Sequence, residues 1–364
     1  MIPHRRWPAE WEPHAATLMI WPHNPGTFRV DRAAKAFRAL CRALAPETVH
    51  ILVSKAPADD LPFQDESNVQ VHVCPSNDSW ARDTAPTFVV EIHLDHQQRH
   101  RLIGLDWQFN AYGGPEKGCY WPCTLDQALA KCVCESVLPS CRHEVPHPQL
   151  ILEGGSIHTD GAGTILTTKE CLLGRNPTMS QQDIESVLLS GLGCQKVIWL
   201  DHGLAFDDDT NGHVDNWCCW VEPGAVVLAW TDDEEGDAEN YRRCRASYKQ
   251  LLRESLKIHK LYLPKPMYYT QDIIDSLQFG DYHGCNVFAR EVGDRMAGSY
   301  VNFYIANDVL LVPQYGDVNA DAAALETLRP LFPDRKCVAI DSLEILIGGG
   351  NIHCVTQQVP HVDG

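Results

Sequence analysis

Residues 152–158, LEGGSIH, and residues 347–353, IGGGNIH, are two copies of one pattern, an apolar start and a glycine-rich run that ends in Ile-His. Three weaker copies begin at residues 81, 213 and 300, where a polar residue precedes a segment with the composition of a β-strand or β-hairpin. Self-similarity along a chain indicates repeated structural units. The alignment of the five copies makes these positions equivalent: Asp83, His158, Asp215, Asn302 and His353.

Helical patterns separate the strand signals. Apolar residues recur at three-and-four spacing across residues 31–45, DRAAKAFRALCRALA, with an Asp near the start. Similar patterns occur at residues 124–138, 178–191, 237–257 and 318–331. Short apolar strands follow several of the helical patterns, at residues 49–53, 196–200 and 337–340. The sequence therefore predicts five ββαβ units.

Five such units are expected to form a ring. One ββαβ unit cannot bury its apolar face alone, so neighbouring units must stack or close on one another. The last unit lacks a second strand after Cys354, and the N-terminal apolar run at residues 15–21 is available to supply it. We therefore expect an α/β fold, a five-bladed α/β propeller of ββαβ repeats, in a single domain of residues 1–364. An open doubly wound sheet is the alternative, but residues 348–350 do not form the GxGxxG motif of nucleotide-binding sheets.

The composition restricts the class of partner. The 364 residues include 30 Lys and Arg against 48 Asp and Glu, for a formal net charge of −18. This balance disfavours nucleic acid and anionic membrane surfaces as partners and favours a small cation, although acidity of this kind also serves solubility alone. No apolar run reaches the ~18 residues of a membrane span, and the N-terminus lacks the features of a signal peptide. We expect a cytoplasmic protein with no membrane partner.

The chain contains 15 cysteines, which a reducing compartment keeps mostly as thiols. Five of them lie between residues 119 and 141, just before His143 and His147. A zinc site is one interpretation of this cluster, but its spacing fits no paired CxxC pattern. We expect ordinary half-buried thiols and no metal.

A group of polar side chains is expected at one mouth of the ring. Equivalent positions of a ring of repeats converge near its axis, together with their neighbours Glu153, His213 and Cys354. Two carboxylates, an imidazole and a thiol at one mouth are a reactive set. His213 and Asp215 lie two residues apart, which on a strand directs both side chains to the same side.

Four motifs, in order along the chain, resemble those of the agmatine deiminases. They are NDSWARD at 77–83, EGGSIH at 153–158, GHVDN at 212–216 and GGGNIHC at 348–354. The N-terminal WPAEWEPH at residues 7–14 resembles the same family, and the similarity covers essentially the whole chain. The resemblance implies membership of the guanidino-group-modifying superfamily, with its five-fold α/β propeller (the pentein fold). It also implies a homo-oligomer, a dimer or larger.

The resemblance assigns roles to five residues. Cys354 is the implied nucleophile, which attacks the guanidine carbon and forms a covalent thiouronium, and His213 is the implied acid and base. Asp83 and Asp215 are expected to bind the planar guanidinium, because a carboxylate accepts two of its N–H groups in a fork. Glu153 is expected to orient His213 or to contact the guanidinium.

Other side chains are expected to line or support this site. Aromatic walls suit methylene chains and cations, which makes Trp80 and Trp107 candidates for the wall of the alkyl channel. Both fit a core position equally well, and Trp80 alone is kept as a candidate for substrate binding. Four residues are expected to have structural or supporting roles: Asp78, Arg82, His158 and His353.

The implied reaction is hydrolysis of agmatine, a small cationic guanidino compound, to N-carbamoylputrescine and ammonia, which belongs to polyamine biosynthesis and uses no cofactor. Deimination of free or peptidyl arginine is the alternative, and it requires a cation such as Arg82 or Arg175 to hold a carboxylate or backbone. A non-catalytic propeller that only binds a partner is a second alternative, but it has no need of the reactive set. A metal hydrolase built on the cysteine cluster is a third.

Overall fold

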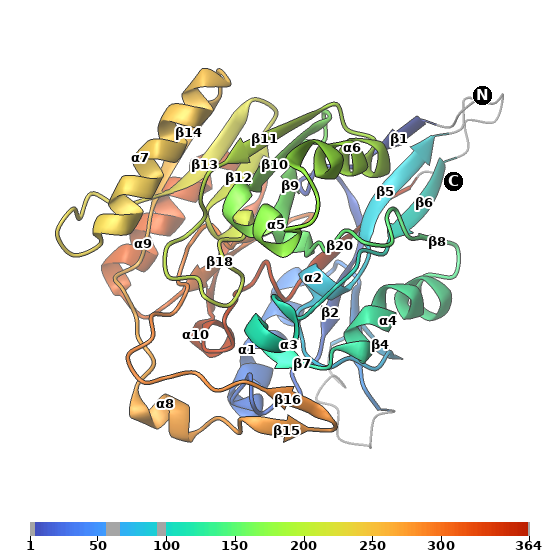
Figure 1. Cartoon of the computed structure of the whole chain (residues 1–364), viewed down its shortest axis with the longest axis horizontal. Helices are drawn as coiled ribbons and strands as arrows, with labels where there is room; N and C mark the ends of the chain where they lie inside the picture. The colour runs from blue at the N-terminus through green and yellow to red at the C-terminus, as the bar shows by residue number, and fades with distance from the viewer. Residues whose placement is uncertain (1–3, 56–65, 93–99, 363–364) are drawn as a thin grey trace.

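The computed structural model describes residues 4–55, 66–92 and 100–362, and five of its sheets share one connectivity (Figure 1). In each of the five, two strands form an antiparallel pair, and the strand after the next helix adds in parallel. The predicted five ββαβ units are therefore confirmed. Figure 1 shows the five sheets arranged around a common centre.

Three of these sheets contain three strands each. Their strands are β9 (Ile157–Thr159), β10 (Thr164–Thr168) and β11 (Lys196–Leu200); β12 (Cys218–Glu222), β13 (Ala225–Trp230) and β14 (Lys257–Tyr262); and β17 (Tyr304–Ile305), β18 (Val309–Gln314) and β19 (Lys336–Asp341). The intervening helices are α5 (Lys169–Arg175), α6 (Gln181–Leu192), α7 (Ala238–Arg253) and α9 (Val318–Leu328). The helices and strands predicted in this part of the chain are present, with ends displaced by a few residues.

A fourth sheet is enlarged by the N-terminus. Its strands, in spatial order, are β1 (His4–Arg6), β5 (Thr87–Ile92), β6 (His100–Leu105) and β8 (Arg142–Glu144). Helix α4 (Thr124–Cys132) precedes β8 and continues as a π-helical turn over Val133–Val137.

The fifth sheet joins the two ends of the chain. Its spatial order is β20 (Gln357–Pro360), β2 (His14–Ile20), β3 (Val49–Val53) and β4 (Val69–Val73). Strand β2 pairs antiparallel with β20, with Ala16 opposite Val359, so the N-terminal run supplies the missing strand as predicted. Between β2 and β3, α1 (Val30–Leu44) buries a stripe of apolar side chains at three-and-four spacing and packs on β18, β19 and α10 (Leu343–Leu346).

One small sheet lies outside the repeats and was not predicted. It pairs β15 (Gly280–Tyr282) with β16 (Cys285–Val287), and β16 with the distant β7 (Tyr120–Trp121). The short helices α3 (Gly114–Lys117) and α8 (Gln271–Asp275) precede its strands. Strands of two or three residues carry too little hydrophobic pattern to be recognised in a sequence.

The cysteine cluster does not form one centre. Cys132 is bonded to Cys74 in a disulfide, which departs from the expected thiols, and Cys134 lies 3.8 Å from the Cys141 sulfur. Among the described residues, the groups of side chains close enough to share a metal ion include none of the five cysteines. No helix in the described ranges is both long and apolar enough to cross a membrane.

Candidate active site

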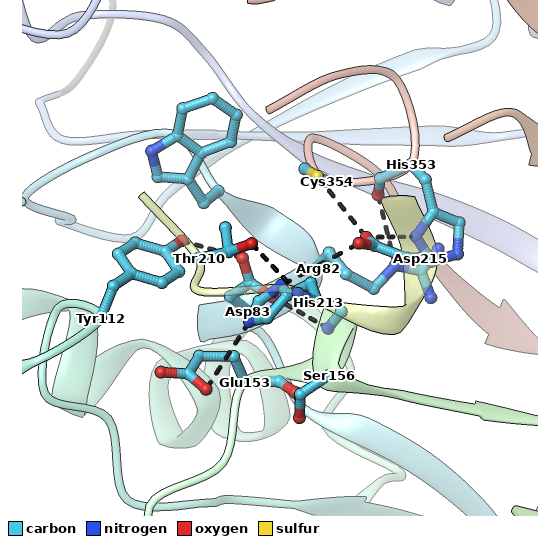
Figure 2. Close-up of polar contacts among 12 residues, drawn as sticks. Arg82, Asp83, Tyr112, Glu153, Ser156, Thr210, His213, Asp215, His353 and Cys354 are labelled. Atoms are coloured by element: carbon cyan, nitrogen blue, oxygen red, sulfur yellow. Dashed lines mark hydrogen bonds and ion pairs between the residues drawn. The ribbon is translucent and has the colours of Figure 1, made fainter. Parts of the chain in front are cut away.

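Four of the predicted residues come from turns that precede strands, and the turns meet in one place (Figure 2). Asp83 lies in the short helix α2 (Ala81–Thr84) and not at the start of a strand. His213 precedes a 3₁₀ turn that contains Asp215, so the prediction that both lie on a strand was wrong. Their side chains still face one another across 4.0 Å, from His213 Nδ1 to Asp215 Oδ1. Cys354 comes from the segment before β20.

The thiol of Cys354 is buried beside polar groups. Its Sγ lies 3.2 Å from Nδ2 of Asn302 and 3.5 Å from Oδ2 of Asp215. Burial raises the pKa of Cys354 well above its usual value, and the charges of Asp215 and Asp83 raise it further. These shifts favour the protonated thiol over the thiolate.

Two carboxylates face the same space. Asp83 accepts hydrogen bonds from the backbone N–H of Gly155 at 2.9 Å and from the Tyr112 hydroxyl at 2.8 Å. Burial raises the pKa of Asp83 to about 6, and the neighbouring acids contribute. Asp215 has Oδ2 at 2.9 Å from His353 Nδ1, whereas its buried Oδ1 has no hydrogen-bond partner. Burial alone would raise the pKa of Asp215, but His353 and His213 lower it below its usual value.

His213 is fully buried, and neither ring nitrogen has a hydrogen-bond partner. Nε2 lies 3.7 Å from Oε2 of Glu153, whose other oxygen accepts a 2.6 Å bond from Nε of Arg175. Burial alone would lower the pKa of His213, but Cys171, Asp83 and Glu153 together raise it well above the usual value. Burial opposes ionisation of Glu153, yet Arg175 and His213 lower its pKa to about 2. The two groups form a buried imidazolium–carboxylate pair.

The glycines of the motifs allow these groups to approach. A Cβ atom at Gly155 would lie 2.6 Å from His213 Nδ1 and 2.8 Å from Asp215 Oδ2. A Cβ atom at Gly350 would lie 2.6 Å from the Trp80 ring and 3.1 Å from Cys354 Sγ. Glycine at these two positions therefore lets the backbone approach the neighbouring side chains more closely than any other residue would.

A cavity of about 170 Å³ opens at the thiol. Cys354, Asp83, Trp80 and Tyr112 are among its lining residues. Trp80 donates from Nε1 to Asp78 at 3.2 Å, and Asp78 lines the cavity as well. Trp107 is a core residue that donates to Thr87, which is the core role that the sequence had left open for it.

The two arginines considered for holding a carboxylate do not line this cavity. Arg82 donates to Gln358 at 2.7 Å and to Glu10 at 3.3 Å, and it does not pair with Asp78. Arg175 is bound to Glu153 and to the Thr210 carbonyl.

The residues of the outer cavity were missed by the sequence reasoning. Arg290 lies with Nη1 at 2.6 Å from both carboxylate oxygens of Asp209, and Arg295 makes a two-pronged pair with Asp237 at 2.7 Å. Three acids line this end of the cavity: Asp208, Asp209 and Asp294. The only sequence signal is the run of three aspartates at 207–209.

This arrangement suits one kind of chemistry. A planar cation placed against Asp83 and the free Oδ1 of Asp215 would meet a thiol on one side and an imidazolium nearby. A carboxylate pair and a nucleophile around an electron-poor carbon favour addition of the thiol and loss of a protonated leaving group.

Comparisons with known proteins agree with this geometry. The family model for Porphyromonas-type peptidyl-arginine deiminase matches residues 6–360. An agmatine deiminase of Pseudomonas aeruginosa is 42% identical to this chain, and the alignment covers 98% of this chain and 95% of the relative. An agmatine deiminase of Medicago truncatula is also 42% identical, and that alignment covers 98% of this chain and 96% of the relative. The solved structure of an Enterococcus faecalis agmatine deiminase, described as catalysing its reaction, superposes with a TM-score of 0.86 at 37% identity, covering 98% of this chain and 96% of that one.

The expected kinship and fold class are thereby confirmed. The family model matches residues 6–360, and the relatives align over nearly their whole length, so the match covers nearly all of the architecture. This chain belongs to the family of Porphyromonas-type peptidyl-arginine deiminases.

Proposed function

We propose that this protein is an agmatine deiminase, which hydrolyses agmatine to N-carbamoylputrescine and ammonia. The observation that carries the proposal is the buried Cys354 thiol beside two carboxylates, one with a free oxygen, at the inner end of an acid-lined cavity. Its relatives at 42% identity over 98% of the chain are agmatine deiminases.

The substrate guanidinium lies between Asp83 and Asp215 in this proposal. Each carboxylate accepts N–H groups from one edge of the ion, which presents the central carbon to Cys354 Sγ. The positive charge of the bound substrate offsets the repulsion that Asp83 and Asp215 exert on a thiolate, so substrate binding itself favours release of the thiol proton to solvent. The Trp80 ring lines the path of the methylene chain.

His213 supplies and removes protons in the two chemical steps. As the Sγ–C bond forms, the imidazolium donates a proton to the departing nitrogen, the C–N bond breaks and ammonia leaves. The neutral ring then takes a proton from a water molecule that attacks the thiouronium carbon. The adduct then collapses: its remaining hydroxyl proton passes to the departing sulfur, the Sγ–C bond breaks and the ureido product leaves, which restores the Cys354 thiol. Glu153, with Oε2 facing His213 Nε2 at 3.7 Å, orients and charges the ring.

The outer cavity favours a second cation over a carboxylate. Nη1 of Arg290 lies against both oxygens of Asp209, and Arg295 makes a two-pronged pair with Asp237, which leaves the charge of both arginines largely neutralised. Asp208 and Asp294 add two negative charges to the lining, against the one positive charge of Lys117. Agmatine ends in an ammonium there, whereas arginine brings a carboxylate that these acids repel.

The remaining parts of the proposal concern the whole protein. Residues 1–364 form one catalytic domain and act as a homo-oligomer in the cytoplasm, and the product belongs to putrescine formation. The reaction uses a thiol and an imidazole and needs neither metal nor cofactor. The formal charge of −18 disfavours nucleic acid and anionic membranes as partners.

The test is ammonia release from agmatine, arginine and an arginyl peptide, measured side by side. We expect kcat/KM to be at least about 100-fold higher for agmatine, because a repelled carboxylate costs a few kcal/mol in a cavity. Cys354→Ser is expected to lose at least about 1,000-fold, because the nucleophile is lost. Cys337→Ser is the matched control, because Cys337 is a partly exposed cysteine of β19.

Each result of these ammonia assays tests a different part of the proposed function. Preference for arginine or the peptide would overturn the choice of substrate. Turnover retained in Cys354→Ser would overturn the thiol mechanism. Activity in none of the three assays would favour a binding module.

A further inference from the structure

The N-terminal segment 7–14 stands outside the reactive set, yet it sends one carboxylate to the back of the site. Glu10 is buried, with only 3% of its surface exposed. Its Oε2 lies 2.8 Å from His353 Nε2 and accepts a 3.3 Å bond from Arg82. Its Oε1 accepts the backbone N–H of Ile305 at 2.8 Å. The carboxylate therefore joins the N-terminal segment to three distant parts of the chain.

The opposite nitrogen of the His353 imidazole faces Asp215, the carboxylate that is proposed to bind the substrate. His353 Nδ1 lies 2.9 Å from Oδ2 of Asp215 (Figure 2). A neutral imidazole carries one N–H and cannot donate to two carboxylates, whereas an imidazolium donates to both. The ring held between Glu10 and Asp215 is therefore an imidazolium.

This geometry leaves one oxygen of Asp215 for the substrate. Oδ2 is occupied by His353, and the buried Oδ1 has no hydrogen-bond partner. A carboxylate held at one oxygen has a defined direction at the other, so Oδ1 is already oriented to accept an N–H of the guanidinium.

We infer that Glu10 is a positioning residue of the reaction, which acts through the His353 imidazolium to direct the free oxygen of Asp215 toward the guanidinium. The inference rests on the proposed function, because its kinetic test requires a guanidino substrate. It gives the N-terminal motif a chemical role.

The charges around His353 decide whether its pKa is raised or lowered. Burial and Arg82 lower the pKa of His353, but Glu10 and Asp215 raise it more, so the net shift is upward. The pKa of His158 is lowered to about 4 by burial, which leaves that ring neutral. The titratable and charged groups that face the His353 ring are Glu10, Asp215, Arg82 and His158.

The test is Glu10→Gln, which keeps the size of the side chain and removes its charge. The pKa of His353 then falls, and the ring loses its second proton at a lower pH. Whenever the remaining proton lies on Nε2, the bare Nδ1 repels Asp215 Oδ2. We expect KM for agmatine to rise about 10–100-fold with a smaller change in kcat, and the alkaline limb of kcat/KM to move down by at least about one pH unit.

Glu12→Gln is the matched control in the same motif. Glu12 pairs with Arg6 at 2.5 Å and accepts the Ala9 N–H at 2.8 Å, remote from His353. Its substitution is expected to leave the pH profile unchanged. A loss in Glu10→Gln that is equal at every pH would overturn the inference, because a merely structural role has no titration.

A double-mutant cycle and a direct titration complete the test. If Glu10 acts only through His353, adding Glu10→Gln to His353→Asn costs no further activity, and a multiplied loss would contradict the relay. NMR titration of the His353 ring is expected to show a lower pKa in Glu10→Gln than in the wild type. The NMR result stands even if the wild type releases no ammonia from agmatine, so failure of the proposed function and failure of this inference are distinguishable.

Discussion

Gly155 shows how single residues create the site. The position lies between His213, Asp215 and Asp83, and any side chain there would meet the ring or a carboxylate within 2.6–3.1 Å. Only a residue without Cβ lets two acids and an imidazole converge behind one backbone turn. Burial then raises the pKa of Asp83, because the two hydrogen bonds that its carboxylate accepts, from the Gly155 N–H and the Tyr112 hydroxyl, replace only part of its hydration.

The pKa of Asp83 predicts the acidic limb of activity. In the substrate-free protein it is raised to about 6, so kcat/KM for agmatine is expected to fall as the pH drops through about 6, where the carboxylate that binds the cation becomes neutral. Because the folded pKa lies above the unfolded value of 3.8, protonation of Asp83 also stabilises the fold as the pH falls from about 6 toward 4.

Asp83→Asn tests this assignment through a pH–rate profile. We expect kcat/KM to fall about 10–100-fold at neutral pH, because a charged hydrogen-bond acceptor is lost, and the limb near pH 6 to disappear. A variant that keeps the wild-type limb would show that another group titrates there.

At the scale of elements, local pattern and long-range pairing contribute differently. The α1 helix was predicted from its apolar spacing alone, and β3 and β11 coincide with their predicted runs. The short hairpin β15–β16 was missed, because two strands of three residues show no periodicity. His213 and Asp215 were placed on a strand because spacing alone does not distinguish a strand from a 3₁₀ turn.

The closing strand β2 is expected to be a main source of stability. Leu18 is fully buried in it, between β20 and β3. Leu18→Ala should lower the free energy of unfolding by about 2–5 kcal/mol, because it leaves a cavity in the core. Leu252→Ala, on the exposed face of α7, is the control and should change stability by less than about 0.5 kcal/mol. Denaturant unfolding measures both, and equal effects would contradict the role of β2.

At the scale of the whole molecule, the ring of five units brings distant segments to one mouth. Asp83 and Cys354, at opposite ends of the sequence, line the same cavity because β2 closes on β20. The formal charge of −18 gives the molecule a net field that attracts cations.

This field predicts a salt dependence of the reaction. The value of kcat/KM for agmatine, a dication, is expected to fall as ionic strength rises from about 20 to 300 mM, because the Debye length shortens to below about 10 Å. For n-butylguanidine, which lacks the ammonium, the slope should be about half as steep, since attraction scales with substrate charge. Equal slopes for the two substrates in stopped-time ammonia assays would show that the field does not steer the substrate.

The sequence by itself determined the repeated units and most of the long helices, and it named the side chains that are proposed to react. These features depend on local periodicity and on residue chemistry, which are present in the chain before it folds. Only the tertiary structure decided which charges remain free at the site. Arg82, Arg175, Arg290 and Arg295 look equally available in the sequence, but each is held by groups from other parts of the fold. Glu10 likewise reaches His353 only after ring closure, because a contact across 343 residues depends on how all five units pack.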